Sequence, residues 1–227
     1  SAASDVYKRQ GFTSVIKNLP EGLGLYIMLT ASQLNAADMR FCNLVDSCLS
    51  YTKMQDFLLD VLEVAWQDDV DENLALLDSI LKRSSYLKEV ENFPSSKVEG
   101  ELEKIQSMTN EDNLIKIVDN IMGHAIEDEW FTRGKESLKK GSPTSAHLIW
   151  LQHLNSSSLS LKEVFNFELN LAIQITRMGD FKEGIRALII DKDNKPKWKY
   201  DSIKNVQQAW IDKHTDLAWE INPLEDL

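Results

Sequence analysis

Apolar side chains recur at intervals of three and four residues along most of this 227-residue chain. That spacing places them on one face of an α-helix, whereas a half-buried strand alternates apolar and polar residues. The clearest runs cover residues 54–65, 74–81 and 161–175. Only residues 44–49 and 188–190 are short strand candidates. The sequence therefore predicts a mainly α fold.

Capping residues and breakers indicate where the helices begin and end. We expect one helix opened by Pro20, one with Ser142 as N-cap and Pro143 in its first position, and a long one that ends near Gly179. Thr109 or Asn110 is the expected cap before an acidic first turn. Further helices are expected over residues 36–44, 74–89, 98–108, 113–122, 127–139 and 202–213.

The run Phe93-Pro94-Ser95-Ser96 interrupts the helical pattern. Proline disfavours the α conformation of the residue before it, and a serine can cap the helix that follows. We therefore expect a hinge at residues 93–97 between two regions, 11–92 and 98–227.

Composition excludes several classes of function. With 43% hydrophobic and 27% charged residues the chain can bury a core. A formal net charge of −11 disfavours nucleic acids and anionic membranes as partners, because both would be repelled outside a local basic patch. We find no apolar run near the roughly 20 residues that span a bilayer and no secretory signal pattern. The chain is expected to be intracellular, with Cys42 and Cys48 as reduced thiols.

The histidines give no metal-binding pattern. His147 and His153 fall on one expected helix but six residues apart, so their side chains point about 240° apart around its axis. An i, i+4 pair could hold one metal ion, and this pair cannot. No metal site is predicted. A Ser-His-Asp arrangement stays open, although no G-x-S-x-G nucleophile motif is present.

Four stretches together carry a family resemblance. They are FKEGIRALIIDKDNKPKW at 181–198, LPEGLGLYIMLTASQL at 19–34, NAADMRFCNLVD at 35–46 and SPTS at 142–145. In this order they resemble the 3-hydroxyisobutyryl-CoA hydrolase branch of the crotonase superfamily, from Gly11 to about Ala209. The first stretch favours this branch over its relatives.

The resemblance implies that the chain is the helical C-terminal part of a crotonase-like α/β fold. In that family the oxyanion-hole amides and the acidic catalytic residues lie in a β-rich N-terminal part, which we expect upstream of Gly11. Where the family has an Asp before its glycine-rich turn, this chain has Arg9. No catalytic residue is therefore assigned within the chain, which is expected to be inactive by itself. Residues 1–10, SAASDVYKRQ, match nothing in the family and are expected to be a non-native scar or a truncated start.

The reaction implied for an intact relative is hydrolysis of a branched 3-hydroxyacyl-CoA thioester in valine breakdown. It needs no metal, and no cofactor beyond the coenzyme A of the substrate. Backbone N–H groups would stabilise the developing oxyanion, and an acidic side chain would act as base or nucleophile. Two alternatives stay open: an enoyl-CoA hydratase or isomerase, since one fold hosts several reactions, and a helical interaction module without catalysis. A bacterial cytoplasm and a mitochondrial matrix both suit the sequence.

The segment 181–198 is locally basic within an acidic chain. With its flanks it holds six basic and four acidic side chains. By resemblance it lies near the adenosine-phosphate end of coenzyme A, so Arg186 and Lys192 are predicted phosphate contacts and Trp198 is a predicted stacking platform for adenine. The alternative is that Glu183 and Arg186 only pair on a helix surface while Ile185, Leu188 and Ile189 pack inward. The other five tryptophans are expected in cores or interfaces.

Glu168 falls on the apolar face of an expected helix, between Phe165 and Ala172. A buried carboxylate is a candidate general acid or base, but most such groups are satisfied by an arginine or by backbone amides. The family usually has an Arg two positions later, where this chain has Asn170, so the expected ion pair is in doubt.

Without the β-rich part, helices that normally cover a sheet would leave apolar faces exposed. Exposed apolar faces drive association, so we expect the chain to self-associate.

Overall fold

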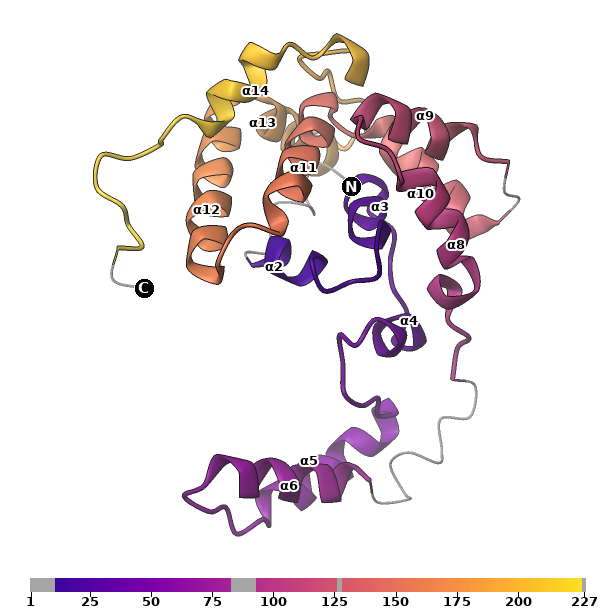
Figure 1. Cartoon of the computed structure of the whole chain (residues 1–227), viewed down its shortest axis with the longest axis vertical. Helices are drawn as coiled ribbons and strands as arrows, with labels where there is room; N and C mark the ends of the chain where they lie inside the picture. Colours follow the sequence, from indigo (N-terminus) through magenta and orange to yellow (C-terminus); the bar gives the residue numbers. More distant parts are fainter. Residues whose placement is uncertain (1–10, 83–92, 126–127, 226–227) are drawn as a thin grey trace. The chain divides into compact units, whose positions relative to one another are not determined.

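The computed structural model describes residues 11–82, 93–125 and 128–225, and within these ranges it contains helices and turns but no β-strand (Figure 1). The chain divides into two compact units. Unit 2 is Leu34–Glu101, and unit 1 combines Ser1–Gln33 with Leu102–Leu227. Mainly α structure is thus confirmed for the described residues.

Unit 1 is a set of packed helices of different lengths. They are α2 (Phe12–Ile16), α3 (Leu23–Thr30), most of α8 (Lys97–Thr109), α9 (Leu114–Gly123), α10 (Glu129–Lys140), α11 (Pro143–Ser156), α12 (Leu161–Met178), α13 (Asp180–Ile185), the π-helix η2 (Arg186–Ile190), the short 3-10 helix η3 (Ile203–Asn205) and α14 (Gln208–Thr215). Side chains of Asn113, Asp128, Ser142 and Ser160 accept backbone N–H groups at the starts of α9 to α12. Each cap satisfies donors that a helix leaves unpaired in its first turn.

Helix α12 lies at the centre of one hydrophobic cluster in unit 1. Its Leu171 and Ile175 pack with Leu148 of α11 and Ile211 of α14. All four side chains are at most 7% exposed, so they contribute the hydrophobic stabilisation that joins these three helices. The same helix ends at Gly179, whose φ of 105° suits glycine.

A second contact joins α10 to α3 through aromatic rings. Tyr26 stacks on Trp130 at 5.5 Å between centroids, and Phe131 meets Tyr26 edge to face at 5.9 Å. The helices approach closely at Gly134, where an added Cβ would lie 3.1 Å from Cβ of Thr30 and 3.3 Å from the hydroxyl of Tyr26. Only glycine fits this position without displacing its neighbours.

Unit 2 contains α4 (Ala36–Phe41), the 3-10 helix η1 (Tyr51–Lys53), α5 (Met54–Leu62), α6 (Val70–Leu81) and the first residues of α8. Buried Asp38 accepts hydrogen bonds from the backbone N–H groups of Asn35 and Val98 and from the hydroxyl of Ser96. This carboxylate therefore ties α4 to the start of α8. Ser96 in turn accepts the N–H of Glu99, as its expected capping role requires.

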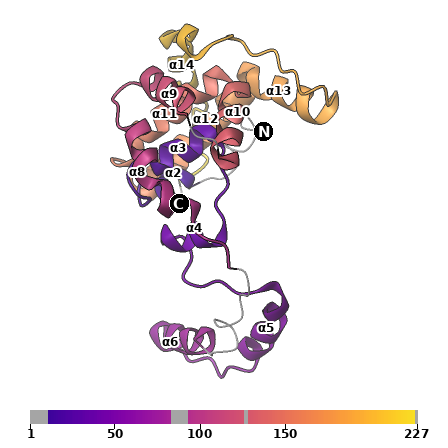
Figure 2. The same ribbon diagram turned by 90° about the vertical axis from the view of Figure 1, so that its right-hand side faces the viewer.

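Helices α5 and α6 lie side by side in both views (Figures 1 and 2). Several large apolar side chains on this pair are exposed, among them Leu59 at 61%, Leu62 at 78% and Val70 at 69%. Exposed apolar faces were expected from the sequence. Self-association through them stays a prediction.

Several expected boundaries are wrong. Residues 188–190 belong to a π-helix and residues 44–49 form turns and irregular backbone, so neither is a strand. Helix α3 begins at Leu23 after Gly22 and not at Pro20. The cap of α9 is Asn113, because its Oδ1 accepts the N–H groups of the second and third helical residues. The last helix begins at Gln208, since Ser202 caps the separate turn η3. The expected continuation of α6 over residues 83–89 lies outside the described residues.

Two glycine substitutions should change stability in opposite directions. In Gly134→Ala the new methyl group meets the buried side chains of Tyr26 and Thr30, so we expect a loss of about 1–2 kcal/mol from overpacking. Gly100 in α8 has no atom within 4 Å of an added Cβ, so Gly100→Ala should gain about 0.5–1 kcal/mol from better helix propensity. Denaturant unfolding of both variants checks this, and stabilisation by Gly134→Ala would contradict it.

Candidate functional site

Arg186 holds the predicted CoA-proximal segment together. Its Nε and Nη2 donate to the two carboxylate oxygens of Glu183 at 3.0 and 2.8 Å. Its Nη1 donates to Asp191 at 2.5 Å and to Asp193 at 2.8 Å, and Nη2 also donates to the carbonyl of Lys195 at 3.1 Å. A guanidinium has five N–H groups, and five bonds are made here. Arg186 could therefore bind a phosphate only by giving up one of these partners.

These contacts change the acidity of the groups involved. Hydrogen bonds from Arg186, and then from the backbone N–H of Lys197, lower the pKa of Glu183 to about 2. The hydrogen bond from Arg186, and then the N–H of Lys195, lower the pKa of Asp193 below its usual value. The carboxylates in turn raise the pKa of Arg186, with Glu183 as the largest cause. All these groups are therefore charged near neutral pH.

The backbone of the segment has unusual conformations. The π-helix η2 brings the N–H of Asp191 to the carbonyl of Arg186 at 2.8 Å. Lys192 and Asn194 follow with φ of 55° and 53°, a left-handed conformation that non-glycine residues rarely adopt. Such π-helices and left-handed residues are enriched at functional sites. Lys192 is exposed, and its ammonium has no hydrogen-bond or ion-pair partner among the residues that the structure describes.

A cavity of about 460 Å³ lies between this segment and α10. Its walls include Ala187, Leu188, Pro196 and Trp198, and Lys140 is one of its basic lining residues. The indole Nε1 of Trp198 donates to the carbonyl of Lys140 at 3.0 Å, which fixes the ring in place. The cavity thus offers an aromatic and aliphatic surface near positive charge.

The three predicted CoA-binding residues are therefore only partly brought together. Arg186 and Lys192 lie on the same short stretch of chain, and Trp198 lines the cavity beside it. The Glu183–Arg186 pair expected in the alternative interpretation is present at 2.8 Å. The inward packing expected with it is wrong for Ile189, which is 55% exposed. Contact of any of these residues with coenzyme A stays a prediction.

Asp180 connects the segment to the start of α11. Its Oδ2 accepts the hydroxyl of Ser142 at 2.6 Å, and its Oδ1 accepts the N–H of Lys199 at 2.9 Å. The expected N-cap Ser142 therefore has a second role that its position in the sequence did not reveal. Lys199 also lies over the ring of Trp210, 4.3 Å from the centroid.

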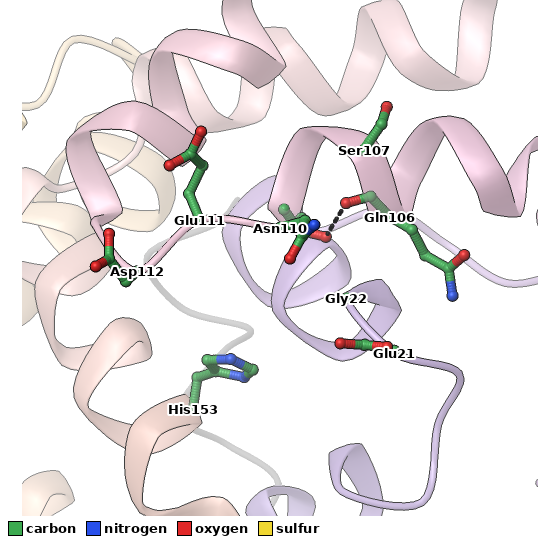
Figure 3. Close-up of a pocket in the computed structure, with 9 residues that line it drawn as sticks. Glu21, Gly22, Gln106, Ser107, Asn110, Glu111, Asp112 and His153 are labelled. Carbon is green, nitrogen blue, oxygen red and sulfur yellow. Dashed lines mark hydrogen bonds between the residues drawn. The ribbon is translucent and has the colours of Figure 1, made fainter.

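A larger cavity of about 700 Å³ lies between the turn before α3, the end of α8 with the loop that follows it, and α11 (Figure 3). Glu21, Glu111 and Asp112 surround its opening together with the ring of His153. Burial lowers the pKa of His153, so this imidazole is neutral near pH 7. The described residues that line the cavity include no Lys or Arg, so it is poorly suited to phosphates. The sequence did not indicate this cavity, because its residues come from three stretches that lie far apart in the sequence.

Glu168 has a structural role in the fold. This side chain is 7% exposed, and its carboxylate accepts the N–H of Thr13 at 2.8 Å and of Gly11 at 2.5 Å. These amides lie at the start of α2, where a helix has no internal partner for them. The prediction that backbone amides satisfy Glu168 agrees with these bonds. Asn170, at the family's arginine position, instead bonds the backbone of Ala218 and Thr215.

The remaining candidates bind backbone groups. His147 lies 2.9 Å from the carbonyl of Ile203, and buried His214 lies 2.8 Å from that of Trp210. Among the described residues no three His, Cys, Asp or Glu side chains are grouped to hold a metal ion. In the same part of the chain, no helix combines the length and apolar character needed to span a membrane.

Comparisons with known proteins identify the family. Residues 7–215 match the family model described as enoyl-CoA hydratase/isomerase. The chain belongs to the enoyl-CoA hydratase/isomerase family. This confirms the crotonase resemblance found in the sequence.

Curated members of the family are similar to this chain over most of its length. The mitochondrial 3-hydroxyisobutyryl-CoA hydrolase of Xenopus laevis is 30% identical over 191 residues, which make up 84% of this chain and 48% of the relative. The human protein of the same description is 29% identical over 195 residues, or 85% of this chain and 48% of the relative. The chain therefore spans about half the length of the curated relatives it matches.

Solved structures of family members share the fold. A carnitinyl-CoA dehydratase from Mycobacterium thermoresistibile aligns with a TM-score of 0.76 at 18% identity, over 96% of this chain and 58% of its own. An enoyl-CoA hydratase from Rhodobacter sphaeroides aligns with a TM-score of 0.69 at 19% identity, over 92% of this chain and 55% of its own. The predicted fold class, a mainly helical part of a crotonase-like fold, is thereby confirmed.

The Glu183 contacts predict a pH dependence of stability. The pKa of this carboxyl is lower in the folded chain than its ordinary value, so its contribution to stability is complete above the ordinary value and is lost as the pH falls toward 2. The stability difference between wild type and Glu183→Gln should therefore shrink below about pH 5. Urea unfolding of both proteins from about pH 7 to about pH 3 measures this. A difference that stays constant over that range would contradict the assignment.

Proposed function

We propose that this family member belongs to an acyl-CoA thioester hydrolase of the 3-hydroxyisobutyryl-CoA type, which would act in valine breakdown. The observation that carries the proposal is the ordered basic segment around Arg186, which fits the sequence pattern of that branch. The names of the Xenopus and human relatives support the same reaction. In the proposal, residues 181–198 form the part of the substrate site nearest the adenosine phosphates.

The charges of the segment suit this role. Lys192 is exposed and forms no ion pair with a carboxylate in the part of the chain that the structure describes, and the ribose phosphate and diphosphate of coenzyme A are strongly anionic. Trp198 presents a fixed ring beside an apolar cavity, where a purine could stack. Arg186 belongs to the same site in the proposal.

The catalytic acids are proposed to come from outside the described residues. The two buried carboxylates within them, Asp38 and Glu168, already accept hydrogen bonds from backbone amides. A general base must be able to take a proton from the attacking water, and these oxygens are occupied. We therefore propose that the chain by itself has negligible thioesterase activity and uses no cofactor beyond the coenzyme A of its substrate.

A hydratase or isomerase acting on enoyl-CoA is the second candidate function. It is favoured by the family description and by the fold shared with the Rhodobacter hydratase. Both candidates act on coenzyme A thioesters, and they differ in the reaction and in the acyl group. An assay of the protein in its full reading frame against 3-hydroxyacyl-CoA and 2-enoyl-CoA substrates separates them. The proposed compartment is the mitochondrial matrix or a bacterial cytoplasm, and the Xenopus and human relatives are described as mitochondrial.

Calorimetric titration of coenzyme A into the 227-residue chain tests the binding proposal. We expect coenzyme A to bind more tightly than dephospho-coenzyme A, because the latter lacks the ribose phosphate. Lys192→Gln should reduce that preference about three- to tenfold, whereas Lys116→Gln, a matched loss of charge on α9, should leave it unchanged. Equal affinity of the wild type for both ligands would contradict the proposal.

Thiol release from 3-hydroxyisobutyryl-CoA tests the location of the catalytic acids. The chain alone should release free thiol no faster than buffer. Release above that rate which disappears on mutating Asp38 or Glu168 would place catalysis within the chain and overturn this part of the proposal.

A further inference from the structure

The backbone from residue 191 to residue 199 is held by hydrogen bonds to side chains and not by regular secondary structure. Between residues 191 and 199 the backbone N–H groups of Lys195, Lys197 and Lys199 are bound by Asp193, Glu183 and Asp180. Distances of 2.7 to 2.9 Å indicate strong hydrogen bonds to carboxylates. The three lysines whose backbone is bound in this way are exposed.

Two of these carboxylates are themselves bound by Arg186. Glu183 receives two of its N–H groups, Asp193 receives one, and the carbonyl of Lys195 receives another. Arg186 therefore touches the loop both through its acidic residues and through its backbone. Replacing it would release several of the loop's tethers at once.

We propose that Arg186 is a positioning residue, which holds residues 191–199 in the form that presents Lys192 to the phosphates of coenzyme A. The inference rests on the proposed function, because it assigns a role within that same binding segment. It differs from a direct contact, in which the guanidinium itself would bind phosphate. All five of its N–H groups are engaged in the structure, which favours positioning.

The two roles predict opposite effects of Glu183→Gln. If Arg186 bound phosphate directly, removing the carboxylate would free two of its N–H groups and remove a repelling charge, so coenzyme A would bind more tightly. If Arg186 positions the loop, Glu183→Gln weakens the hydrogen bond that Glu183 accepts from the backbone N–H of Lys197. The loop is then held less firmly, and coenzyme A binds less tightly. We expect the preference for coenzyme A over dephospho-coenzyme A to fall about tenfold. A purely structural role would lower thermal stability without changing that preference.

The conservative variant Arg186→Lys provides a second test. Lysine keeps the charge and is a good phosphate ligand, but it lacks the planar fork that binds several carboxylates. If Arg186 is a positioning residue, Arg186→Lys should lose the preference for coenzyme A over dephospho-coenzyme A as fully as Arg186→Gln does. If Arg186 contacts the phosphate directly, Arg186→Lys should keep most of that preference.

The experiment measures both affinities by calorimetry for the whole chain and for each variant, with circular dichroism to confirm folding. Glu111→Gln is the control, since it removes one negative charge and the ion pair with Lys116 outside this segment. If Glu183→Gln does not fold, Asp193→Asn replaces it, because Asp193 also joins Arg186 to the backbone of Lys195.

The inference is supported if Glu183→Gln has a reduced preference for coenzyme A over dephospho-coenzyme A and Arg186→Lys has lost that preference. Unchanged or tighter binding by Glu183→Gln, or retained preference in Arg186→Lys, overturns it while leaving the proposed function intact. A wild-type chain without preference for coenzyme A would instead remove the proposed function of the segment, and the positioning role with it.

Discussion

Buried backbone groups that no helix satisfies need hydrogen bonds from elsewhere, and in unit 1 the helix α12 supplies them. Glu168 binds the N–H groups at the start of α2, while Gln174 donates to the carbonyl of Asp216 at 2.7 Å. Asn170 accepts the N–H of Ala218 at 2.8 Å. Segments near both ends of the chain are thus hydrogen-bonded to α12. The apolar face of the same helix packs against α11 and α14. An unpaired polar group at such a site costs more than the bond itself contributes.

The same principle explains why a basic segment contains so many acids. Asp180, Glu183 and Asp193 bind the backbone of the following lysines, and Arg186 offsets the negative charges of Glu183 and Asp193. The arginine therefore neutralises two of these acids, the acids fix the backbone, and the lysines are left at the surface. Basic composition alone does not identify which residue meets a ligand, because the most strongly paired cation is the least available.

The sequence predicted features that depend on neighbours in the chain. The Ser142–Pro143 helix start, the glycine at the end of α12 and the Glu183–Arg186 pair at i, i+3 all follow from local spacing. Features that depend on distant contacts were missed. Asn110 and Asn113 are equally good caps in sequence, and only the path of the chain selects Asn113. The His153 cavity and the four partners of Arg186 likewise require the folded arrangement.

A net charge of −11 gives these contacts a further consequence. An acidic chain repels polyanions at long range, so a phosphate site on it needs positive charge that acts locally and stays in place. Mobile lysines would supply charge but would lose conformational freedom on binding, which weakens affinity. A loop fixed in advance by three carboxylates and one arginine avoids much of that loss for its backbone. On the proposal that this segment binds coenzyme A, the internal ion pairs of residues 183–193 would therefore contribute to its affinity as well as to its stability.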